Sequence, residues 1–569
     1  MKNIPLYEVR KISDLRDMLR QSVKHYGDRT AFLVKGEQGS DYSPVTYNQY
    51  GRDVDGFGTA LLQLGVTNGR VAILAETRYE WYVSYMSTVN GVGTIVPLDK
   101  ELPQVEIKNL LNRSHADVLI YSKSKLKDVQ AIRQDTPEVK HFICMDDVPG
   151  EVGDLLFSDL LADGRMRVES GDQRYLNAAV DPEAMRILLF TSGTTAASKA
   201  VMLSHRNICI NLQAMCSMVD IKQDDVFLSV LPLHHTYECT CGFLVPVYRG
   251  ASVAVCEGLR HIVKNLQESH ATVILVVPLM LELFYKRIIK SATSDPKLAK
   301  KFNFGRKLSK ALMAVGIDKR RKLFAKIQDN FGGKLRLIIA GGAAIDPAVL
   351  SGMQEFGFAC FQGYGLTECA PILALNRDVD FKNESAGLPL PGVEVRIINK
   401  DENGIGEIIG KGPNVMLGYY ENQEATAAAI DAAGFFHTGD LGYLDKDGFV
   451  IITGRKKNVI ITKNGKNIYP EEIEFLLYKS ELIQECLVFG GADEEGEIVV
   501  RAEIFPNMEK IKETHGFDAA LSDDVRRLIA EEVKTVNHQL ATYKYIRSFT
   551  LRDAEFEKTT SKKIKRKYT

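Results

Sequence analysis

The stretch Phe190-Thr-Ser-Gly-Thr-Thr-Ala-Ala-Ser-Lys-Ala200 links a predicted strand to a predicted helix start. The apolar run Ile187–Phe190 before it predicts a buried strand, and Ser204 after it can cap a helix. Between them the loop offers hydroxyl groups, one flexible glycine and one mobile cation, from Thr191, Ser192, Thr194, Thr195, Gly193 and Lys199. A strand, a donor-rich loop and a helix N-terminus together predict a site for a polyanion.

The loop does not follow the Walker pattern G-x-x-x-x-G-K-S/T, so a standard P-loop is not implied. A Ser/Thr-rich surface turn explains the same residues without any ligand. The stretch by itself leaves both interpretations open, and other parts of the chain have to decide between them.

The composition is that of an ordinary globular protein, with 45% hydrophobic and 25% charged residues among 569. This length predicts roughly three or four folding units. A formal net charge of −1 provides no global field that would attract nucleic acid. The nine cysteines include no CxxC pair, which favours a reducing compartment over a disulfide scaffold.

The N-terminal residues lack the apolar core of a signal peptide, and the apolar run 271–284 is too short to span a bilayer. We therefore expect a cytoplasmic protein. One group of residues resembles a metal site but matches no zinc spacing, so we expect no metal there; it consists of His234, His235, Cys239 and Cys241.

Strand-like and helix-like stretches alternate over residues 10–380, which predicts mostly parallel sheets covered by helices. Apolar runs predict strands at 71–75, 93–97, 118–121, 142–144, 228–232, 272–278 and 334–340. Gly341-Gly-Ala-Ala344 follows the last run, and Asp346-Pro347 then predicts a capped helix start. A ligand site is expected where these strands end.

From residue 390 the pattern changes to strand pairs around Asp401-Glu-Asn-Gly404 and Asp445-Lys-Asp-Gly448. Such turns are typical of hairpins, so this part is predicted to be antiparallel and barrel-like. We place the main domain boundary at Lys457, with residues 1–457 as the large domain and 458–569 as a small α+β domain.

Residues 286–334 are predicted to be helical and carry thirteen lysines and arginines between Lys286 and Lys322. This stretch could face a membrane, but a solvated charged face is the favoured interpretation because basic helices are often simply exposed.

Nine separate stretches resemble the motifs of the adenylate-forming superfamily of acyl- and aryl-CoA synthetases, luciferases and peptide-synthetase adenylation domains. The resemblance covers nearly the whole chain, and the stretches occur in the order and spacing of the family. They are residues 191–200, 231–235, 341–344, 363–368, 406–407, 437–440, 454–455, 464–474 and 558–566. Within the superfamily, Val277-Pro278, Phe284-Tyr285 and the long helical stretch before Leu337 look like the long-chain fatty acyl-CoA synthetases. The resemblance implies an α/β fold with two doubly wound sheets, a distorted antiparallel barrel and a small mobile C-terminal domain.

The resemblance also implies roles for single residues in binding ATP. Residues 191–195 and Lys199 would hold its β- and γ-phosphates, and Thr191 and Glu368 would serve Mg²⁺, which prefers oxygen ligands. Tyr364 would offer a flat face to adenine, and Thr367 would place a hydroxyl near the α-phosphate. Asp440 would accept both ribose hydroxyls, and Arg455 would support the ribose or a phosphate. The walls of the nucleotide and acyl sites would be small residues, namely Gly341, Gly342, Ala343, Gly363 and Gly365.

Catalytic roles carry over in the same way. His235 occupies the position of the histidine at the carboxylate end of the substrate, whereas His234 does not match the motif. Lys563 aligns with the late catalytic lysine, although Lys562 is an obvious competitor. A cation bridging the carboxylate and the α-phosphate stabilises charge that builds up in the transition state. Gly465 would border the path of CoA, and Lys457 would be the hinge of the small domain.

The chain departs from the family pattern at four positions. Ala196 and Ala200 replace glycines of the usual loop, Ser198 replaces a proline, and Lys562 replaces a glycine near the end. We still expect activity, because alanine keeps the volume of the loop small.

The resemblance thus implies AMP-forming ligation of a medium- to long-chain fatty acid to coenzyme A through an acyl adenylate. Its co-substrates would be ATP and CoA, with Mg²⁺. Two alternatives remain open: a ligase that passes the acyl group to an acyl carrier protein, and a peripheral membrane lipid-binding protein that has lost turnover. The sequence leaves open the preferred chain length, membrane contact and the oligomeric state, for which a homodimer is one option.

Overall fold

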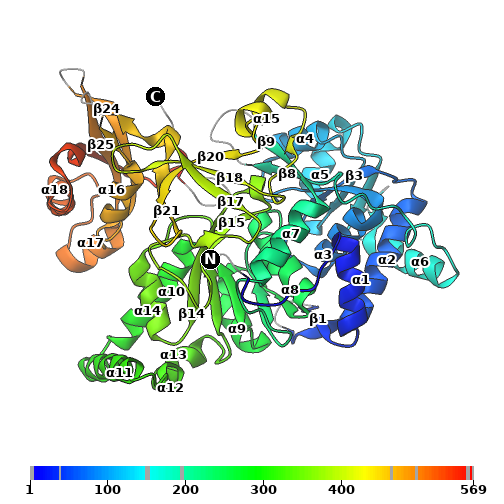
Figure 1. The fold of residues 1–569 in the computed structure, drawn as a ribbon, viewed down its shortest axis with the longest axis horizontal. Coiled ribbons are helices and arrows are strands. Elements are labelled where there is room, and N and C mark those ends of the chain that lie inside the picture. Colours follow the sequence, from blue (N-terminus) through cyan, green and yellow to red (C-terminus); the bar gives the residue numbers. More distant parts are fainter. Residues whose placement is uncertain are drawn as a thin grey trace.

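The computed structural model describes residues 5–36, 40–147, 154–191, 198–461, 466–493, 497–558 and 564–566. It shows a large body and a smaller C-terminal lobe, drawn in orange and red in Figure 1. Among the described residues no helix is long and apolar enough to cross a membrane.

The first sheet of the body has eight strands in the order β19-β9-β8-β4-β3-β5-β6-β7. Strands β8, β4, β3, β5, β6 and β7 run parallel, as the apolar runs predicted, while β9 and β19 are antiparallel additions. The bounds are β3 (Gly69–Leu74), β4 (Gly93–Pro97), β5 (Val118–Tyr121), β6 (His141–Cys144), β7 (Leu155–Leu156), β8 (Met185–Thr191), β9 (Lys199–Ser204) and β19 (Gly418–Tyr419).

The second sheet has nine strands in the order β16-β15-β14-β13-β12-β10-β11-β1-β2. Its six central strands are parallel, and its outer strands β2, β15 and β16 are antiparallel. The bounds are β1 (Thr30–Val34), β2 (Ser43–Thr46), β10 (Val226–Ser229), β11 (Ser252–Val255), β12 (Val273–Val276), β13 (Leu337–Ala340), β14 (Ala359–Gly365), β15 (Ile372–Leu375) and β16 (Leu388–Pro389).

Helices surround both sheets, so the body has the doubly wound α/β architecture that the sequence predicted (Figure 1). Those of the N-terminal half are α1 (Leu15–Tyr26), α2 (Tyr47–Gln63), α3 (Tyr79–Ser87), α4 (Gln104–Arg113), α5 (Leu126–Ile132), α6 (Phe157–Glu169) and α7 (His205–Cys216). Those that follow are α8 (Val245–Arg249), α9 (Ile262–Ser269), α10 (Pro278–Ala292), α11 (Pro296–Ala314), α12 (Arg320–Leu323), α13 (Ala325–Asn330), α14 (Pro347–Glu355) and α15 (Gln423–Ala429).

The Phe190–Ala200 stretch differs from its prediction in one respect. It joins two antiparallel strands, with Thr191 opposite Lys199, and does not lead directly into a helix. Ser204 does cap a helix, because its Oγ accepts from the N–H of Asn207, but this cap lies at the end of β9. The reason is that Ala200, Val201 and Leu203 are buried and complete the sheet. The helix N-terminus is therefore one strand away from the donor-rich loop.

The antiparallel part is a four-stranded sheet in the order β17-β18-β20-β21, comprising β17 (Glu394–Ile398), β18 (Gly406–Lys411), β20 (Phe436–Leu444) and β21 (Val450–Arg455). Both predicted turns are present. Asp401 accepts backbone N–H groups of Asn403 and Ile405, and Asp445 does the same in the second turn. These side-chain bonds explain why aspartate opens each turn.

The C-terminal lobe has its own hydrophobic core, which includes Ile473, Val488 and Ile529. Its strands are β22 (Ile460–Ile461), β23 (Asn467–Ile468), β24 (Ile483–Ala492), β25 (Ile498–Pro506) and β26 (Ile546–Leu551). Its helices are α16 (Pro470–Leu477), α17 (Met508–His515) and α18 (Asp523–Asn537). A short 3-10 turn, Lys456–Asn458, connects it to β21. The domain boundary and hinge at Lys457 stay predictions.

Candidate active site

A large cavity, about 3870 Å³ in volume, lies where the strands of the body end and extends between the body and the C-terminal lobe. Its wall takes residues from loops far apart in the chain. Among the residues that the sequence singled out, those lining it are Thr191, Lys199, His235, Gly341, Gly342, Ala343, Gly363, Gly365, Thr367, Glu368, Arg455 and Lys457. Ser192, Gly193, Thr194, Thr195, Gly465 and Lys563 lie outside the described residues.

Glu368 lies in a 3-10 turn directly after β14, and its carboxylate has a phenol partner. The hydroxyl of Tyr419 donates to Oε1 of Glu368 at 2.9 Å. Burial, followed by the charge of Glu368, raises the pKa of Tyr419, so the phenol keeps its proton and donates. The Lys199 ammonium lies 4.5 Å from the centre of the same ring. Tyr419 thus connects the carboxylate to the cation, a role that no motif of the sequence predicted.

Thr191 ends β8 at the cavity, and its hydroxyl donates to the carbonyl of Lys199 at 3.3 Å. Magnesium usually binds to one or two carboxylates together with substrate phosphates, keeping several waters. One carboxylate on Glu368 and one hydroxyl on Thr191, both facing the cavity, suit such a cation. Assignment of the metal to these two residues stays a prediction.

The loop after β13 approaches the cavity closely because its first two residues are glycines. A Cβ on Gly341 would lie 2.9 Å from the ring of Tyr237. That ring is held in place, since its hydroxyl donates to the carbonyl of Ile339 at 2.9 Å. Gly342 has φ +91° and Ala343 is exposed, so the loop presents mainly backbone to the cavity.

Residues of β14 alternate between two environments, as expected of a strand. Gly363 and Gly365 line the cavity, whereas Tyr364 between them is buried. The hydroxyl of Tyr364 donates to Oδ2 of Asp440 at 2.5 Å. In this structure Tyr364 is not part of the cavity wall, so its predicted contact with adenine remains to be tested.

Asp440 and Arg455 are direct cross-strand partners on β20 and β21. The Nε of Arg455 lies 2.7 Å from Oδ1 of Asp440, and Tyr364 occupies the other oxygen. The ion pair joins β20 to β21 and so has a structural role in this arrangement. Arg455 lines the cavity and Asp440 does not. To accept the ribose hydroxyls as predicted, Asp440 would have to use further lone pairs of its carboxylate or release Tyr364 or Arg455.

His235 and His234 both line the cavity, with ring centroids 4.1 Å apart. Burial, followed by the proximity of His235, holds the pKa of His234 well below its usual value. Nε2 of His234 lies 3.5 Å from Oδ2 of Asp99. The neighbouring Cys239 and Cys241 are buried, and the Sγ of Cys241 contacts the Sδ of Met215 at 3.6 Å.

Glu238 follows the two histidines in the helical segment Tyr237–Leu244, and no motif of the sequence predicted a role for it. It is buried, and Oε1 accepts from the hydroxyl of Ser229 at 2.6 Å, which is itself 3.0 Å from the hydroxyl of Tyr82. Burial raises the pKa of Glu238 to about 8, although the Ser229 hydroxyl and the Leu231 N–H favour the charged form. A carboxyl of this kind is mainly protonated at neutral pH.

The cavity continues into an apolar region between α7, β10, α8 and α10. Its wall there is made by the side chains of Met215, Cys216, Val219, Ile221, Phe227, Val245, Leu279, Leu283 and Phe284. The cavity wall therefore combines charged groups such as Glu368 with many apolar side chains, which suits an amphipathic acid.

The C-terminal lobe contributes its last residues to the cavity. Lys558 and Ile564 line it and form an antiparallel bridge, and Arg566 binds Glu474 through two hydrogen bonds of 2.7 and 2.6 Å. Lys562 and Lys563 lie between these residues but outside the described part of the chain.

The stretch around Gly465, which was predicted to border the path of CoA, contacts the body away from the cavity. Lys466, next to Gly465, forms an ion pair with Glu402, and the hydroxyl of Tyr469 donates to Asp401 at 2.9 Å. Both partners belong to the first hairpin turn of the body. Lys466 is not part of the cavity wall, whereas Lys457 is. Burial, followed by the charges of Arg455 and Arg566, lowers the pKa of Lys457.

Comparison with known proteins agrees with this geometry. The family model of AMP-binding enzymes matches residues 19–420, and the model of their C-terminal domain matches residues 457–569. A Mus musculus protein named long-chain-fatty-acid–CoA ligase 6 is 27% identical over 525 residues, covering 86% of this chain and 75% of its own. A Rhodococcus jostii (strain RHA1) propanoyl:CoA ligase, whose named substrate carries a methyl-dioxo-octahydroindenyl group, is 31% identical, covering 84% of this chain and 86% of its own.

Solved structures share the fold. The anthranilate CoA ligase AuaEII with anthranoyl-AMP has a TM-score of 0.75 at 22% identity, covering 99% of this chain and 97% of its own. ATP-bound MatB from Rhodopseudomonas palustris has a TM-score of 0.73 at 24% identity, with 97% of each chain covered. Because family models match both parts of the chain, the protein belongs to the AMP-binding enzyme family, as an adenylate-forming CoA ligase.

Proposed function

We propose that the protein joins a medium- to long-chain fatty acid to coenzyme A, with ATP converted to AMP and pyrophosphate. The observation that carries this proposal is the cavity, whose wall combines charged groups such as Glu368 with many apolar side chains. Several of the curated relatives are named long-chain-fatty-acid–CoA ligases, which supports the same class of substrate.

In the first step the fatty carboxylate attacks the α-phosphate of ATP, giving acyl-AMP and pyrophosphate. Lys563 would bridge the two anions, and its neighbours Lys558 and Ile564 at the cavity support this role. Thr191 and Glu368 would hold Mg²⁺, which neutralises phosphate charge when bound. Thr367, the small residues of the 341–344 loop, and Gly363 and Gly365 of β14 would position the nucleotide.

In the second step the CoA thiolate attacks the mixed anhydride, giving the thioester and AMP. Gly465 would border the path of the thiol. Because Lys466 contacts Glu402 outside the cavity, this stretch has to move before it can serve the site. A rotation of the lobe about Lys457 would bring it there, so we assign Lys457 as the hinge.

A bulkier acid is the second candidate. The Rhodococcus jostii relative is 31% identical to this chain, against 27% for the long-chain-fatty-acid–CoA ligase from Mus musculus, and its named substrate is a fused-ring propanoate. Both classes are apolar carboxylic acids, and a pocket separates such acids by only about 1–3 kcal/mol for each methylene that fits or fails to fit.

Exchange of labelled pyrophosphate into ATP tests the first step without CoA. We expect exchange with oleate and MgATP, none without acid, and formation of oleoyl-CoA once CoA is added. A ring propanoate in a parallel reaction tests the second candidate. Absence of exchange with every fatty, aromatic and ring acid would contradict the proposal and favour a lipid-binding protein without turnover.

A further inference from the structure

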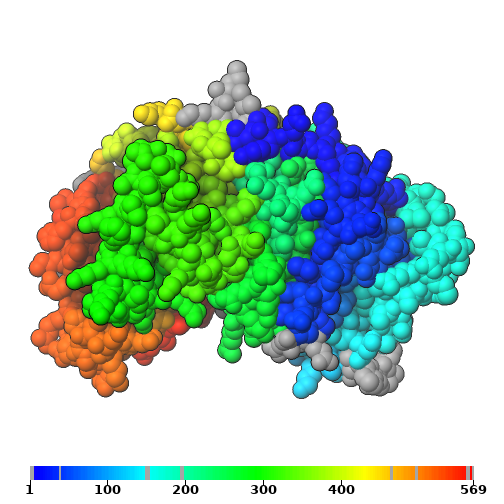
Figure 2. All heavy atoms as spheres, turned by 90° about the horizontal axis from the view of Figure 1, so that it is seen from below, coloured from blue at the N-terminus to red at the C-terminus, as the bar shows by residue number. Residues whose placement is uncertain are grey.

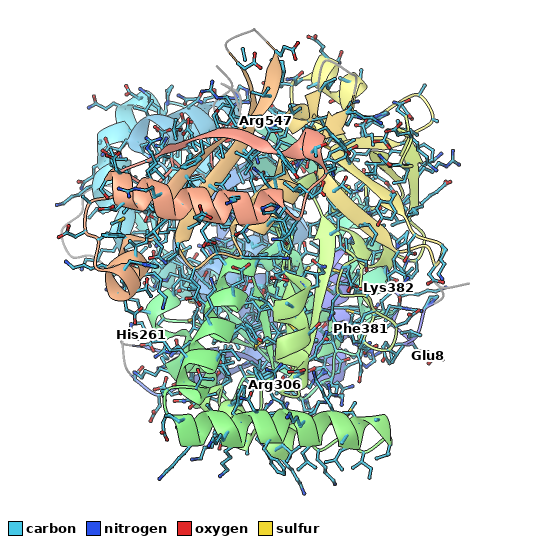
Figure 3. All side chains as sticks on the ribbon, turned by 90° about the vertical axis from the view of Figure 1, so that its left-hand side faces the viewer. Glu8, His261, Arg306, Phe381, Lys382 and Arg547 are labelled. Carbon is cyan, nitrogen blue, oxygen red and sulfur yellow. The ribbon has the colours of Figure 1, made fainter. Side chains whose placement is uncertain are left out.

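Helix α11 and the residues that follow it, 296–317, project from the body and are almost fully exposed. Figure 3 shows α11 as a long helix lying across the bottom of the molecule, and Figure 2 looks at this face from below, with the segment in green at the left. Ser309 is the only residue of α11 that is buried. A helix in this position has a whole side with no protein partner among the described residues.

The segment exposes several large apolar residues. Phe304 is 67% exposed, Leu298 46% and Val315 69%, and Leu308, Met313 and Ile317 are exposed as well. With Leu279 and Leu283 of α10, eight of the 22 large hydrophobic residues exposed in the described chain lie within residues 279–317. A face that was merely solvated would not concentrate apolar side chains in this way.

The same segment is strongly basic. Residues 296–317 contain six lysines and arginines and no aspartate or glutamate, while the whole chain has a net charge of −1. Two of the six are used to hold the helix, since Arg306 and Lys310 pair with Glu355 of α14 at 2.7 and 3.0 Å. Arg306 is labelled in Figure 3 on the side of the helix that faces the body.

The other four cations have no such role. Lys297, Lys300, Lys301 and Lys307 are exposed and make no ion pair with the described residues. Phe304 and Leu308 lie among them, whereas Phe302, which shares a helix face with Leu298 and Arg306, packs against Phe324 and Phe356. One side of α11 thus anchors the helix, and the other presents apolar residues among unpaired lysines.

We propose that the exposed side of residues 296–317 docks on the surface of an anionic lipid bilayer. Apolar side chains entering the headgroup region and lysines binding anionic lipids are the two attractions that hold an amphipathic helix in the interface. Charge complementarity selects this occupant over a second copy of the chain, because two copies would bring four lysines against four lysines.

The position of α10 indicates what docking by residues 296–317 would do for the reaction. This step rests on the proposed function. Leu279 and Leu283 are each 57% exposed and also line the cavity, and α10 leads through three residues into α11. A fatty acid dissolved in the bilayer would meet this apolar edge of the cavity without crossing water. Docking through α11 brings the edge to the membrane where such an acid is stored.

Co-sedimentation of the full chain with vesicles tests the docking without any substrate. One set of vesicles is phosphatidylcholine and the other mixes phosphatidylcholine with phosphatidylglycerol. We expect binding to the anionic vesicles, reversed by high salt. Replacing Lys300, Lys301 and Lys307 by Gln should weaken it about a hundredfold, since each basic residue contributes about fivefold. Phe304→Gln with Leu308→Gln should weaken binding without changing its salt dependence.

The matched control replaces Lys24, Lys127 and Lys512 by Gln, three exposed lysines on α1, α5 and α17. It changes the net charge equally and should bind like the original protein, and melting temperatures should be unchanged in all variants. Equal loss in the control, or equal binding by all variants, would overturn the proposal. Self-association without vesicles that depends on Phe304 and Leu308 would assign the face to a second copy and also overturn it.

A turnover measurement separates this proposal from the proposed function. With oleate embedded in anionic vesicles the Lys300, Lys301 and Lys307 variant should be slow, whereas with a short water-soluble acid it should match the original protein. Absence of turnover with both acids would contradict the proposed function and leave the vesicle binding as an independent result. Equal turnover of vesicle-embedded oleate by both proteins would contradict delivery from the bilayer.

Discussion

Tyr419 shows how a single side chain outside any motif can organise the site. Its phenol donates to Glu368 and its ring faces Lys199, so it connects the carboxylate predicted to serve Mg²⁺ with the cation predicted to hold phosphate. It stands on the two-residue strand β19, paired with β9, far along the chain from both partners. No local pattern marks such a residue, because its role comes from strand pairing.

Glu368→Gln tests the metal assignment at this scale. The substitution keeps volume and leaves Tyr419 a partner but removes the charge. We expect pyrophosphate exchange to fall by about a hundredfold to a thousandfold, the usual cost of removing one group that stabilises developing charge. Circular dichroism should be unchanged. Exchange equal to that of the original protein would remove Glu368 from the site.

Glu238 gives a prediction for pH. Because its pKa is raised from 4.5 to about 8, the folded state binds a proton that the unfolded state has released between these values. This contribution to stability is complete below about pH 4.5 and is lost as the pH rises through about 8. Melting temperatures of Glu238→Gln should therefore fall less over this range than those of the original protein. Parallel curves for the two proteins would show that Glu238 is ionised throughout.

At the scale of elements, the sequence predicted most strands because continuous apolar runs mark strands buried on both faces. Runs at 71–75, 93–97 and 118–121 became β3, β4 and β5, and both aspartate turns formed hairpins. The helix start at Ser204 was confirmed, but strand β9 between the loop and this helix was missed, since its apolar residues were not recognised as a strand. The network of Tyr82, Ser229 and Glu238 could not be predicted, because its members are distant in the chain.

The hairpin of β14 and β15 gives a test of close packing behind the cavity. A Cβ at Gly365 would lie 2.0 Å from the carbonyl oxygen of Pro371, which is backbone and cannot rotate away. At Gly363 the nearest atom is a methyl group of Leu375 at 3.0 Å, which can adjust. We expect Gly365→Ala to cost about 3 kcal/mol or more of stability and Gly363→Ala about 1. Equal melting temperatures for the two variants would contradict this packing.

At the scale of the whole molecule, the lobe presents two different surfaces. Its terminal residues, Lys558 and Ile564 to Arg566, line the cavity, and the Lys466 side contacts the Asp401–Glu402 turn. The two stretches cannot both be at one acyl phosphate. This arrangement supports a lobe that serves adenylation first and rotates about Lys457 for thioester formation.

Lys457→Pro and Lys563→Ala should separate the two steps. Proline restricts φ at the hinge, so acyl-AMP should still form while thioester formation collapses. Lys563→Ala should fail to adenylate but still convert supplied acyl-AMP with CoA. Lys457→Ala, which leaves the backbone free, is the control and should retain both steps. Parallel loss of both steps in both variants would contradict rotation, and a defect in Lys562→Ala alone would shift the catalytic lysine by one residue.

Competition among saturated acids of increasing length, with ATP and CoA present, tests the central claim most directly. Products are identified and quantified by mass spectrometry. We predict equal amounts of AMP and acyl-CoA, with medium or long chains preferred over short ones because the apolar wall of the cavity rewards each buried methylene. Formation of ADP in place of AMP, or the absence of acyl-CoA from acids of every length, would contradict the account.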